Sequence, residues 1–129
     1  MDHKLKLMVV DDSPLFRTWL IHSLSADDRF QVVGYAVNAL DAQEKIPLLQ
    51  PDMLTLDIEM PGMSGIDFLK QLLPVHPIPV ILVSSLNLRV FDALEAGAVD
   101  FVRKPDEANG LSKEIFLSML RSKLLVAAA

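Results

Sequence analysis

The chain has 129 residues, the size of one ordinary domain, and 51% of them are hydrophobic, which is enough for a core without staples. It has no cysteine, so disulfides and thiolate metal sites are excluded, and its net charge of −5 with scattered basic residues argues against a nucleic-acid partner. The charged start is no signal peptide and no apolar run reaches the length of a membrane span, so we expect a cytoplasmic protein with no membrane partner.

Five short runs rich in valine, leucine and isoleucine follow one another along the chain. They are Leu5–Val10, Gln31–Ala36, Met53–Leu56, Val80–Val83 and Val99–Val102. Because the runs are mostly continuous rather than alternating, they predict strands that are covered on both faces, as in a parallel sheet. Segments of helical length separate them. The sequence therefore predicts an α/β fold, an open sheet with helices on both sides.

The segments between the strands carry helix signals. The predicted N-caps are Ser13, Asn38, Ser64 and Ser112, and the fourth helix should close at Gly97. Pro47 should break or kink the second helix near its end. Apolar residues at helical spacing predict the buried faces. On the first helix these are Leu15, Phe16, Trp19, Leu20 and Leu24, and on the last they are Ile115 and Met119 with Phe116 beside them.

Polar side chains follow four of the predicted strands, at the sheet edge where ligands bind in open α/β folds. They are Asp11 and Asp12 after the first strand, Asp57 after the third, Ser84 after the fourth and Lys104 after the fifth. Each of them alone has an ordinary explanation, such as a helix-dipole contact, a turn, a cap or a solvated lysine. Their occurrence at successive strand ends predicts a single site.

The chemistry of this site follows from its charges. Carboxylates held close together repel one another unless they take up protons or bind a cation. Oxygen ligands without histidine or cysteine favour a hard ion, so we expect Mg²⁺, with Mn²⁺ as the second candidate. A carboxylate can also attack phosphorus and form an aspartyl-phosphate. We expect Asp57 to be this nucleophile, while Mg²⁺, Lys104 and Ser84 neutralise the phosphoryl oxygens.

Three segments resemble the receiver domain of bacterial response regulators. They are Val9–Ser13, Leu56–Gly65 and Gly97–Pro105, and the resemblance extends over nearly the whole chain, so residues 1–129 are expected to form one receiver domain. It implies a flavodoxin-like sheet of five strands in the order 2-1-3-4-5, flanked by five helices, and phosphorylation of Asp57 by a histidine kinase. It also implies direct Mg²⁺ ligands in Asp12, Asp57 and the Glu59 backbone carbonyl, a role largely through water for Asp11, and switch residues Ser84 and Phe101.

A narrower resemblance links the chain to the regulatory half of chemotaxis protein-glutamate methylesterases. It rests on Asp11–Pro14, Thr55–Pro61, Val83–Leu86 and Gly97–Phe101. It implies a histidine kinase of the chemotaxis type as phosphodonor and a methylesterase effector domain, absent from this chain, as the output. The chain has no G-x-S-x-G motif, so we expect it to catalyse only its own phosphotransfer and dephosphorylation. The stretch Leu86–Ala96, where the fourth helix is predicted, is about one turn shorter than this resemblance implies.

Other functions are compatible with parts of the pattern. A stand-alone receiver that docks to a partner protein would carry the same residues. An aspartyl-phosphate hydrolase would need an acid two residues after the nucleophile, which Glu59 supplies, and then a threonine, where this chain has Pro61. A flavodoxin relative that binds FMN would need a hydroxyl-rich loop after the first strand, where this chain has Asp11 and Asp12.

Overall fold

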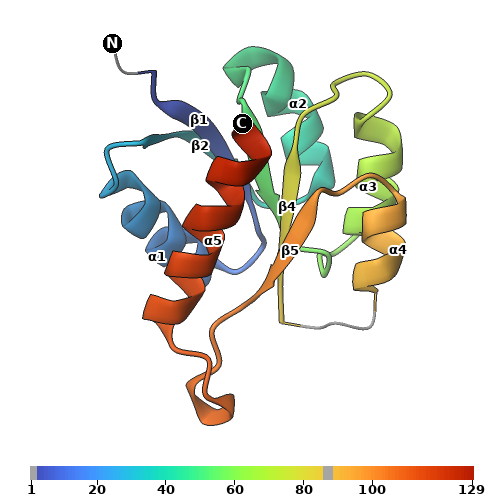
Figure 1. Ribbon diagram of the computed structural model, residues 1–129. Coiled ribbons are helices and arrows are strands. Elements are labelled where there is room, and N and C mark those ends of the chain that lie inside the picture. Colours follow the sequence, from blue (N-terminus) through green and yellow to red (C-terminus); the bar gives the residue numbers. More distant parts are fainter. Residues whose placement is uncertain (1–2, 86–88) are drawn as a thin grey trace.

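Five parallel strands form one sheet in the order β2-β1-β3-β4-β5 (Figure 1). The structure is a computed structural model and describes residues 3–85 and 89–129. The strands are β1 (Leu5–Val10), β2 (Phe30–Ala36), β3 (Met53–Leu56), β4 (Val80–Ser84) and β5 (Asp100–Arg103). Each strand begins and ends within one residue of its predicted bounds. The predicted fold class and strand order are confirmed.

Two layers of helices cover this sheet. The helices are α1 (Pro14–Ser25), α2 (Ala39–Leu49), α3 (Gly65–Leu72), α4 (Val90–Glu95) and α5 (Lys113–Ala128), with a short 3-10 helix η1 (Glu107–Asn109) before the last. Helices α1 and α5 pack on one face of the sheet, and α2, α3 and α4 on the other (Figure 1). Among the described residues, no helix is long and apolar enough to cross a membrane.

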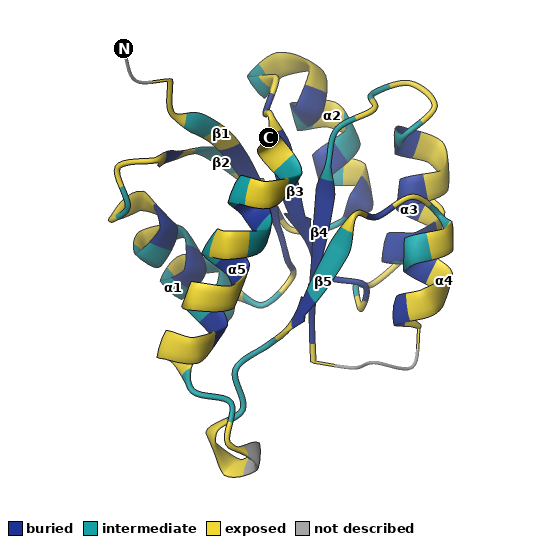
Figure 2. Cartoon of the chain, viewed as in Figure 1, coloured by how far each residue is buried: buried dark blue, intermediate teal, exposed yellow. Residues whose placement is uncertain are grey.

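The central strands are buried on both faces, which explains their continuous apolar sequences (Figure 2). Side chains alternate between the two faces of a strand. In β1, Leu7 and Val9 therefore join the core under α1 and α5, whereas Met8 and Val10 join the core under α2, α3 and α4. The sheet is thus a rigid, two-sided support, and its strand ends hold the residues that follow them in fixed positions.

Side-chain caps begin four of the helices as predicted. The oxygens of Ser13, Asn38, Ser64 and Ser112 accept the backbone N–H of the residue three positions later, at 2.8–3.4 Å. The C-cap of α4 is Ala96, one residue before the predicted Gly97, and Gly97 follows it with φ +116° and makes the left-handed turn that ends the helix. Glycine is suited to this position because it adopts positive φ without steric cost.

The apolar face of α5 differs from the prediction. Phe116, Leu120 and Leu124 are buried, whereas Ile115 is 51% exposed and Met119 is 44% exposed. Both sets have helical spacing, so the period alone cannot select between them. The set that contains Phe116 is the buried one because the Phe116 ring packs against aromatic rings of α1.

One further helix prediction is corrected. Leu15 is 87% exposed and does not join the buried face of α1, because it lies in the first turn and points away from the sheet.

Helix α2 continues past Pro47 to Leu49, and Gln50 in the left-handed conformation caps it. Only the last turn lies beyond the proline, so its missing N–H does not interrupt the body of the helix. Of the stretch Leu86–Ala96, residues 90–95 form α4, and residues 86–88 lie outside the described residues.

Candidate functional site

The carboxyl ends of two adjacent strands bring three aspartates together. Asp11 and Asp12 follow β1 and Asp57 follows β3, and these strands pair in register, with Val10 opposite Leu56. The Asp57 N–H donates to the Val10 carbonyl at 3.0 Å and so continues the pairing to the edge of the sheet. One carboxylate oxygen from each aspartate lies within 4.8 Å of the other two. These three side chains are called the acidic cluster below.

Lys104 provides the positive charge at the acidic cluster. Its Nζ lies 3.0 Å from Asp11 Oδ2 and donates a hydrogen bond to Asp57 Oδ2 at 3.3 Å. The Lys104 backbone N–H donates to the Ser84 carbonyl at 3.0 Å, which fixes the start of the segment after β5 against the end of β4. The ammonium therefore bridges carboxylates from two different strands, and its side chain is only 16% exposed.

Burial governs the electrostatics of Asp57. This residue is 4% exposed, and loss of water around its carboxylate raises the pKa of Asp57 to about 6. The charge of Lys104 and the Glu59 N–H, which donates to Asp57 Oδ1 at 3.0 Å, lower the pKa, while Asp11 raises it. Desolvation outweighs the attractive contacts, so the protein alone does not fully stabilise the ionised cluster.

Backbone contacts fix the segment that carries Asp11 and Asp12. Asp11 is buried, and its Oδ1 accepts the N–H of Ser13 at 2.8 Å. The guanidinium of Arg17, one turn into α1, donates to the Asp11 carbonyl at 2.9 Å. Asp12 is exposed to solvent. The cluster therefore combines two buried carboxylates of fixed position with one carboxylate that faces water.

This donor set suits a hard divalent cation. All three side chains offer carboxylate oxygens, and Asp12 opens the cluster to solvent. Mg²⁺ binds through one or two carboxylates while keeping several waters, so a partly open cluster of this kind suits it. A bound ion would also compensate the charge that burial leaves poorly stabilised at Asp57.

The remaining predicted site residues lie around the cluster. Ser84 is the last residue of β4 and is 4% exposed. Glu59 is exposed, two residues beyond Asp57. Phe101 lies in β5, opposite Leu82, and packs partly buried against the core under α2, α3 and α4. The structure thus brings Ser84 and Lys104 to the same sheet edge as the aspartates, while Phe101 lies within β5, three residues before Lys104.

Two residues near the cluster were not predicted from the sequence to belong to the site. A Cβ on Gly65 would lie 2.8 Å from Ile58 Cα and 3.0 Å from Asp57 O, so glycine allows the start of α3 to approach the Asp57 backbone. A glycine inside the first turn of a predicted helix is a usable signal for such an approach. The ring of Phe16 lies 4.5 Å from Lys104 Nζ. No sequence signal shows this contact, because the two residues belong to segments that are distant along the chain.

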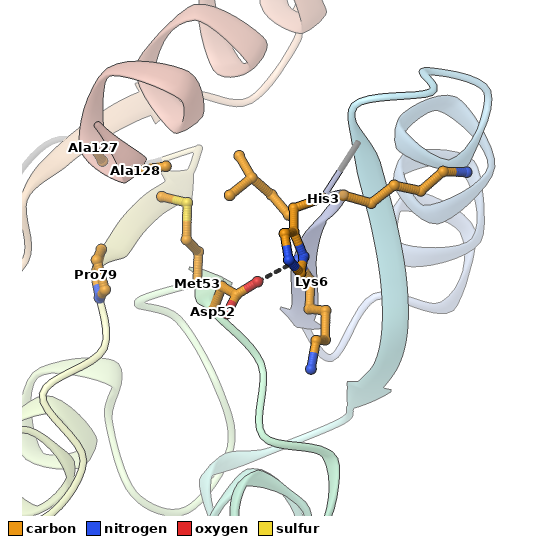
Figure 3. Close-up of a pocket in the computed structure, with 9 residues that line it drawn as sticks. His3, Lys6, Asp52, Met53, Pro79, Ala127 and Ala128 are labelled. Atoms are coloured by element: carbon orange, nitrogen blue, oxygen red, sulfur yellow. Dashed lines mark hydrogen bonds between the residues drawn. The ribbon is translucent and has the colours of Figure 1, made fainter. Parts of the chain in front are cut away.

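A pocket at the opposite edge of the sheet lacks comparable chemistry. It measures about 440 Å³ and is lined in part by His3, Lys6, Asp52 and Pro79 (Figure 3). Asp52 Oδ2 accepts the backbone N–H of Lys6 at 2.8 Å, which joins the start of β1 to the segment before β3. This contact explains Asp52 as a structural residue. The acidic cluster is therefore the candidate site.

Comparisons with known proteins agree with this arrangement. The pattern of the family described as "Response regulator receiver domain" matches residues 7–116. The chain is 47% identical over 124 residues to a protein-glutamate methylesterase/protein-glutamine glutaminase of Syntrophomonas wolfei, and 47% identical over 133 residues to one of Syntrophotalea carbinolica. These alignments cover 96% and 98% of this chain but 36% and 37% of the relatives. The chain thus spans about a third of their length.

Solved structures show the same likeness. The response regulator domain of Thermotoga maritima CheB superposes with a TM-score of 0.81 at 36% identity, covering 97% of this chain and 94% of that chain. The receiver domain of the putative response regulator NarL from Mycobacterium tuberculosis superposes with a TM-score of 0.76 at 32% identity, covering 93% of this chain and 96% of that chain. Both likenesses extend over nearly the entire fold.

Proposed function

This chain belongs to the response regulator receiver domain family, and we propose that it is a phosphorylation switch in which Asp57 accepts the phosphoryl group. One observation carries the proposal: a buried aspartate at the end of a central strand lies beside two further aspartates and a lysine that bridges it to one of them. The family match covers residues 7–116, and we propose that residues 1–129 form a single receiver domain.

Phosphoryl transfer at this site needs positioning and charge neutralisation more than acid–base chemistry. A carboxylate oxygen of Asp57 attacks phosphorus, the bond from phosphorus to the leaving oxygen of the donor breaks, and the leaving group departs with that electron pair. With acetyl phosphate as donor, the products are the aspartyl-phosphate and acetate. Lys104, 3.3 Å from Asp57 Oδ2, is placed to neutralise one phosphoryl oxygen.

Asp11, Asp12 and Asp57 would hold Mg²⁺ or Mn²⁺, with the Glu59 backbone carbonyl as a further ligand. When bound, the ion supplies positive charge that lowers the barrier for bringing a phosphate dianion against a carboxylate. Ser84, at the end of the neighbouring strand, would donate its hydroxyl to another phosphoryl oxygen. Movement of Ser84 would change the packing around Phe101 and so convert phosphorylation into a change of surface.

The relatives suggest what this switch controls. Both relatives described above carry the name protein-glutamate methylesterase/protein-glutamine glutaminase, and the match leaves most of their length outside the aligned region. We propose that a histidine kinase of the chemotaxis type phosphorylates this receiver and that a methylesterase effector is its output. The coding sequence that follows Ala129 provides a direct test, because an esterase domain there would support this assignment and a stop codon would support a stand-alone receiver.

The test of the phosphorylation site uses a small-molecule donor. Incubation with acetyl phosphate and Mg²⁺ should add one phosphoryl group by intact-protein mass spectrometry, and Asp57→Asn should abolish the addition. Asp28→Asn is a matched control, because Asp28 is exposed in the turn before β2, at the far edge of the sheet, and should leave labelling unchanged. Labelling that persists in Asp57→Asn would overturn the assignment.

A further inference from the structure

Among the residues that the structure describes, three lie against the Lys104 ammonium, and they are of two chemical kinds. Two are carboxylate oxygens, Asp11 Oδ2 at 3.0 Å and Asp57 Oδ2 at 3.3 Å, and the third is the ring of Phe16, with its centroid 4.5 Å from Nζ. A cation at this distance is attracted by the negative face of an aromatic ring. The ring accepts no ordinary hydrogen bond, so the ammonium N–H groups remain available to the carboxylates.

Phe16 itself is fixed on more than one side. Its ring lies 5.7 Å from that of Trp19 and 5.9 Å from that of Phe116, the latter in an edge-to-face arrangement with an interplanar angle of 66°. Phe116 is 2% exposed and comes from α5. The Phe16 backbone N–H also donates to the Ser13 cap at 3.4 Å. The ring is therefore part of an aromatic group that joins α1 to α5, and it offers Lys104 a surface of fixed position.

A lysine side chain needs such a surface more than most groups. Its four-carbon stem has many rotamers, and fixing the ammonium costs conformational entropy. Without the ring, Lys104 could satisfy its charge by extending into water beside the exposed Asp12, away from Asp57. The ring covers one side of the ammonium and so restricts it to the space between the two buried carboxylates.

Given the proposed phosphorylation of Asp57, on which this step rests, we propose that Phe16 is a positioning residue for phosphotransfer. Its ring holds the Lys104 ammonium where the phosphoryl oxygens arrive. Phe16 acts through Lys104, and this role requires an aromatic ring rather than apolar volume. A variant that keeps the volume but loses the ring therefore distinguishes positioning of Lys104 from core packing.

The test compares Phe16→Leu, which keeps apolar bulk without a ring, with Phe16→Tyr, which keeps the ring. At saturating Mg²⁺, the rate of phosphorylation by acetyl phosphate should fall about two- to fivefold in Phe16→Leu and recover in Phe16→Tyr, as expected for loss of one partly exposed cation–π contact. The Mg²⁺ dissociation constant, measured by titration calorimetry, should be the same in all three proteins.

A second readout does not depend on activity. In the metal-free protein, the Lys104 Cε protons should show an upfield ring-current shift in the NMR spectrum that disappears in Phe16→Leu and persists in Phe16→Tyr. Phe30→Leu is the matched control, since Phe30 is buried in the same core under α1 and α5 but lies at the start of β2, away from Lys104. That variant should change neither the rate nor the Lys104 shift.

The outcomes separate this inference from the proposed function. Equal rates in the parent protein and Phe16→Leu, or Lys104 protons without a ring-current shift, would overturn the role of Phe16 and leave the phosphorylation site intact. A rate loss that Phe16→Tyr fails to restore would indicate packing rather than positioning and would also overturn it. If the parent protein took up no phosphoryl group, the proposed function and this inference would both be wrong.

Discussion

At the scale of single residues, Asp57 is held in an environment that opposes its ionised form. It is 4% exposed, and burial raises its pKa to about 6 despite the nearby lysine. The folded protein therefore binds a proton at Asp57 more tightly than the unfolded chain does. By linkage, this group favours folding less as the pH rises from about 4 through 6. The ionised form of Asp57, which is the reactive form, therefore destabilises the folded state.

Asp57→Asn should consequently stabilise the metal-free protein. Asparagine carries no charge to desolvate, so we expect the free energy of unfolding to rise by about 1–3 kcal/mol at pH 7.5. The difference between variant and parent should shrink as the pH falls to 4, where Asp57 is protonated in the folded parent. Urea unfolding in the presence of EDTA, carried out at pH 7.5 and at pH 4, measures the free-energy difference between variant and parent at each pH. A variant less stable than the parent at pH 7.5 would show that Asp57 is not strained by burial.

Removing Lys104 should have the opposite effect. Lys104→Met leaves the carboxylates of Asp11 and Asp57 buried without their cation, so the metal-free protein should lose about 2–4 kcal/mol of stability. Mg²⁺ should restore most of this loss, because a bound ion replaces the missing positive charge. Thermal unfolding with and without Mg²⁺ compares the two states. Lys70→Met, at an exposed position of α3, is the control and should change the stability neither without nor with Mg²⁺. A loss of stability in Lys104→Met that Mg²⁺ does not reduce would contradict the account.

At the scale of elements, an ion-pair network joins α5 to the turn between α1 and β2. Asp27 accepts two hydrogen bonds from the Arg29 side chain, at 3.0 and 2.6 Å, and its Oδ2 lies 3.5 Å from Arg121 Nε of α5. Arg121 also donates to the Ser23 carbonyl at 3.1 Å. The Arg29 hydrogen bonds lower the pKa of Asp27 to about 2. This network adds to the aromatic contacts that hold α1 and α5 together.

Asp27→Asn should weaken this connection. At pH 7 the variant should be about 1–2 kcal/mol less stable than the parent, since the side chain of Asp27 is only 13% exposed. Because the folded pKa lies below the unfolded value, the contribution of Asp27 is present above pH 4 and disappears as the pH falls toward 2. The difference in unfolding free energy between Asp27→Asn and the parent should close over that range, and Asp28→Asn should show no such change. A difference that stays constant from pH 7 to pH 2 would rule out the ionised pair.

Element boundaries could be predicted because local chemistry determines them. The caps Ser13, Asn38, Ser64 and Ser112 each use a side chain within three residues of its partner, and the continuous apolar runs follow from burial on both faces. The buried side of α5 could not be predicted in this way. Two apolar sets with the same period compete there, and the choice depends on contact with Phe16 and Trp19, which are distant in sequence.

At the scale of the whole molecule, the parallel sheet brings residues that are distant in the sequence together into one site. Parallel strands end at one edge, so residues at the carboxyl ends of β1, β3, β4 and β5 lie together although they are far apart in the sequence, and the acidic cluster could be predicted for that reason. The contact between Lys104 and Phe16 could not be predicted from the sequence. It depends on the rotamer of Lys104, which follows β5, relative to a ring on α1, which follows β1. Topology brings segments together, whereas rotamers decide which atoms touch.

The most direct test of the central claim is to locate the phosphoryl group chemically. Borohydride reduces an acyl phosphate to an alcohol, so treating the phosphorylated protein with borohydride should leave homoserine in place of Asp57, identified by peptide mass spectrometry. The account predicts this product at position 57 alone, and none when EDTA replaces Mg²⁺ during phosphorylation. Homoserine at another aspartate, or its formation without a divalent ion, would contradict it.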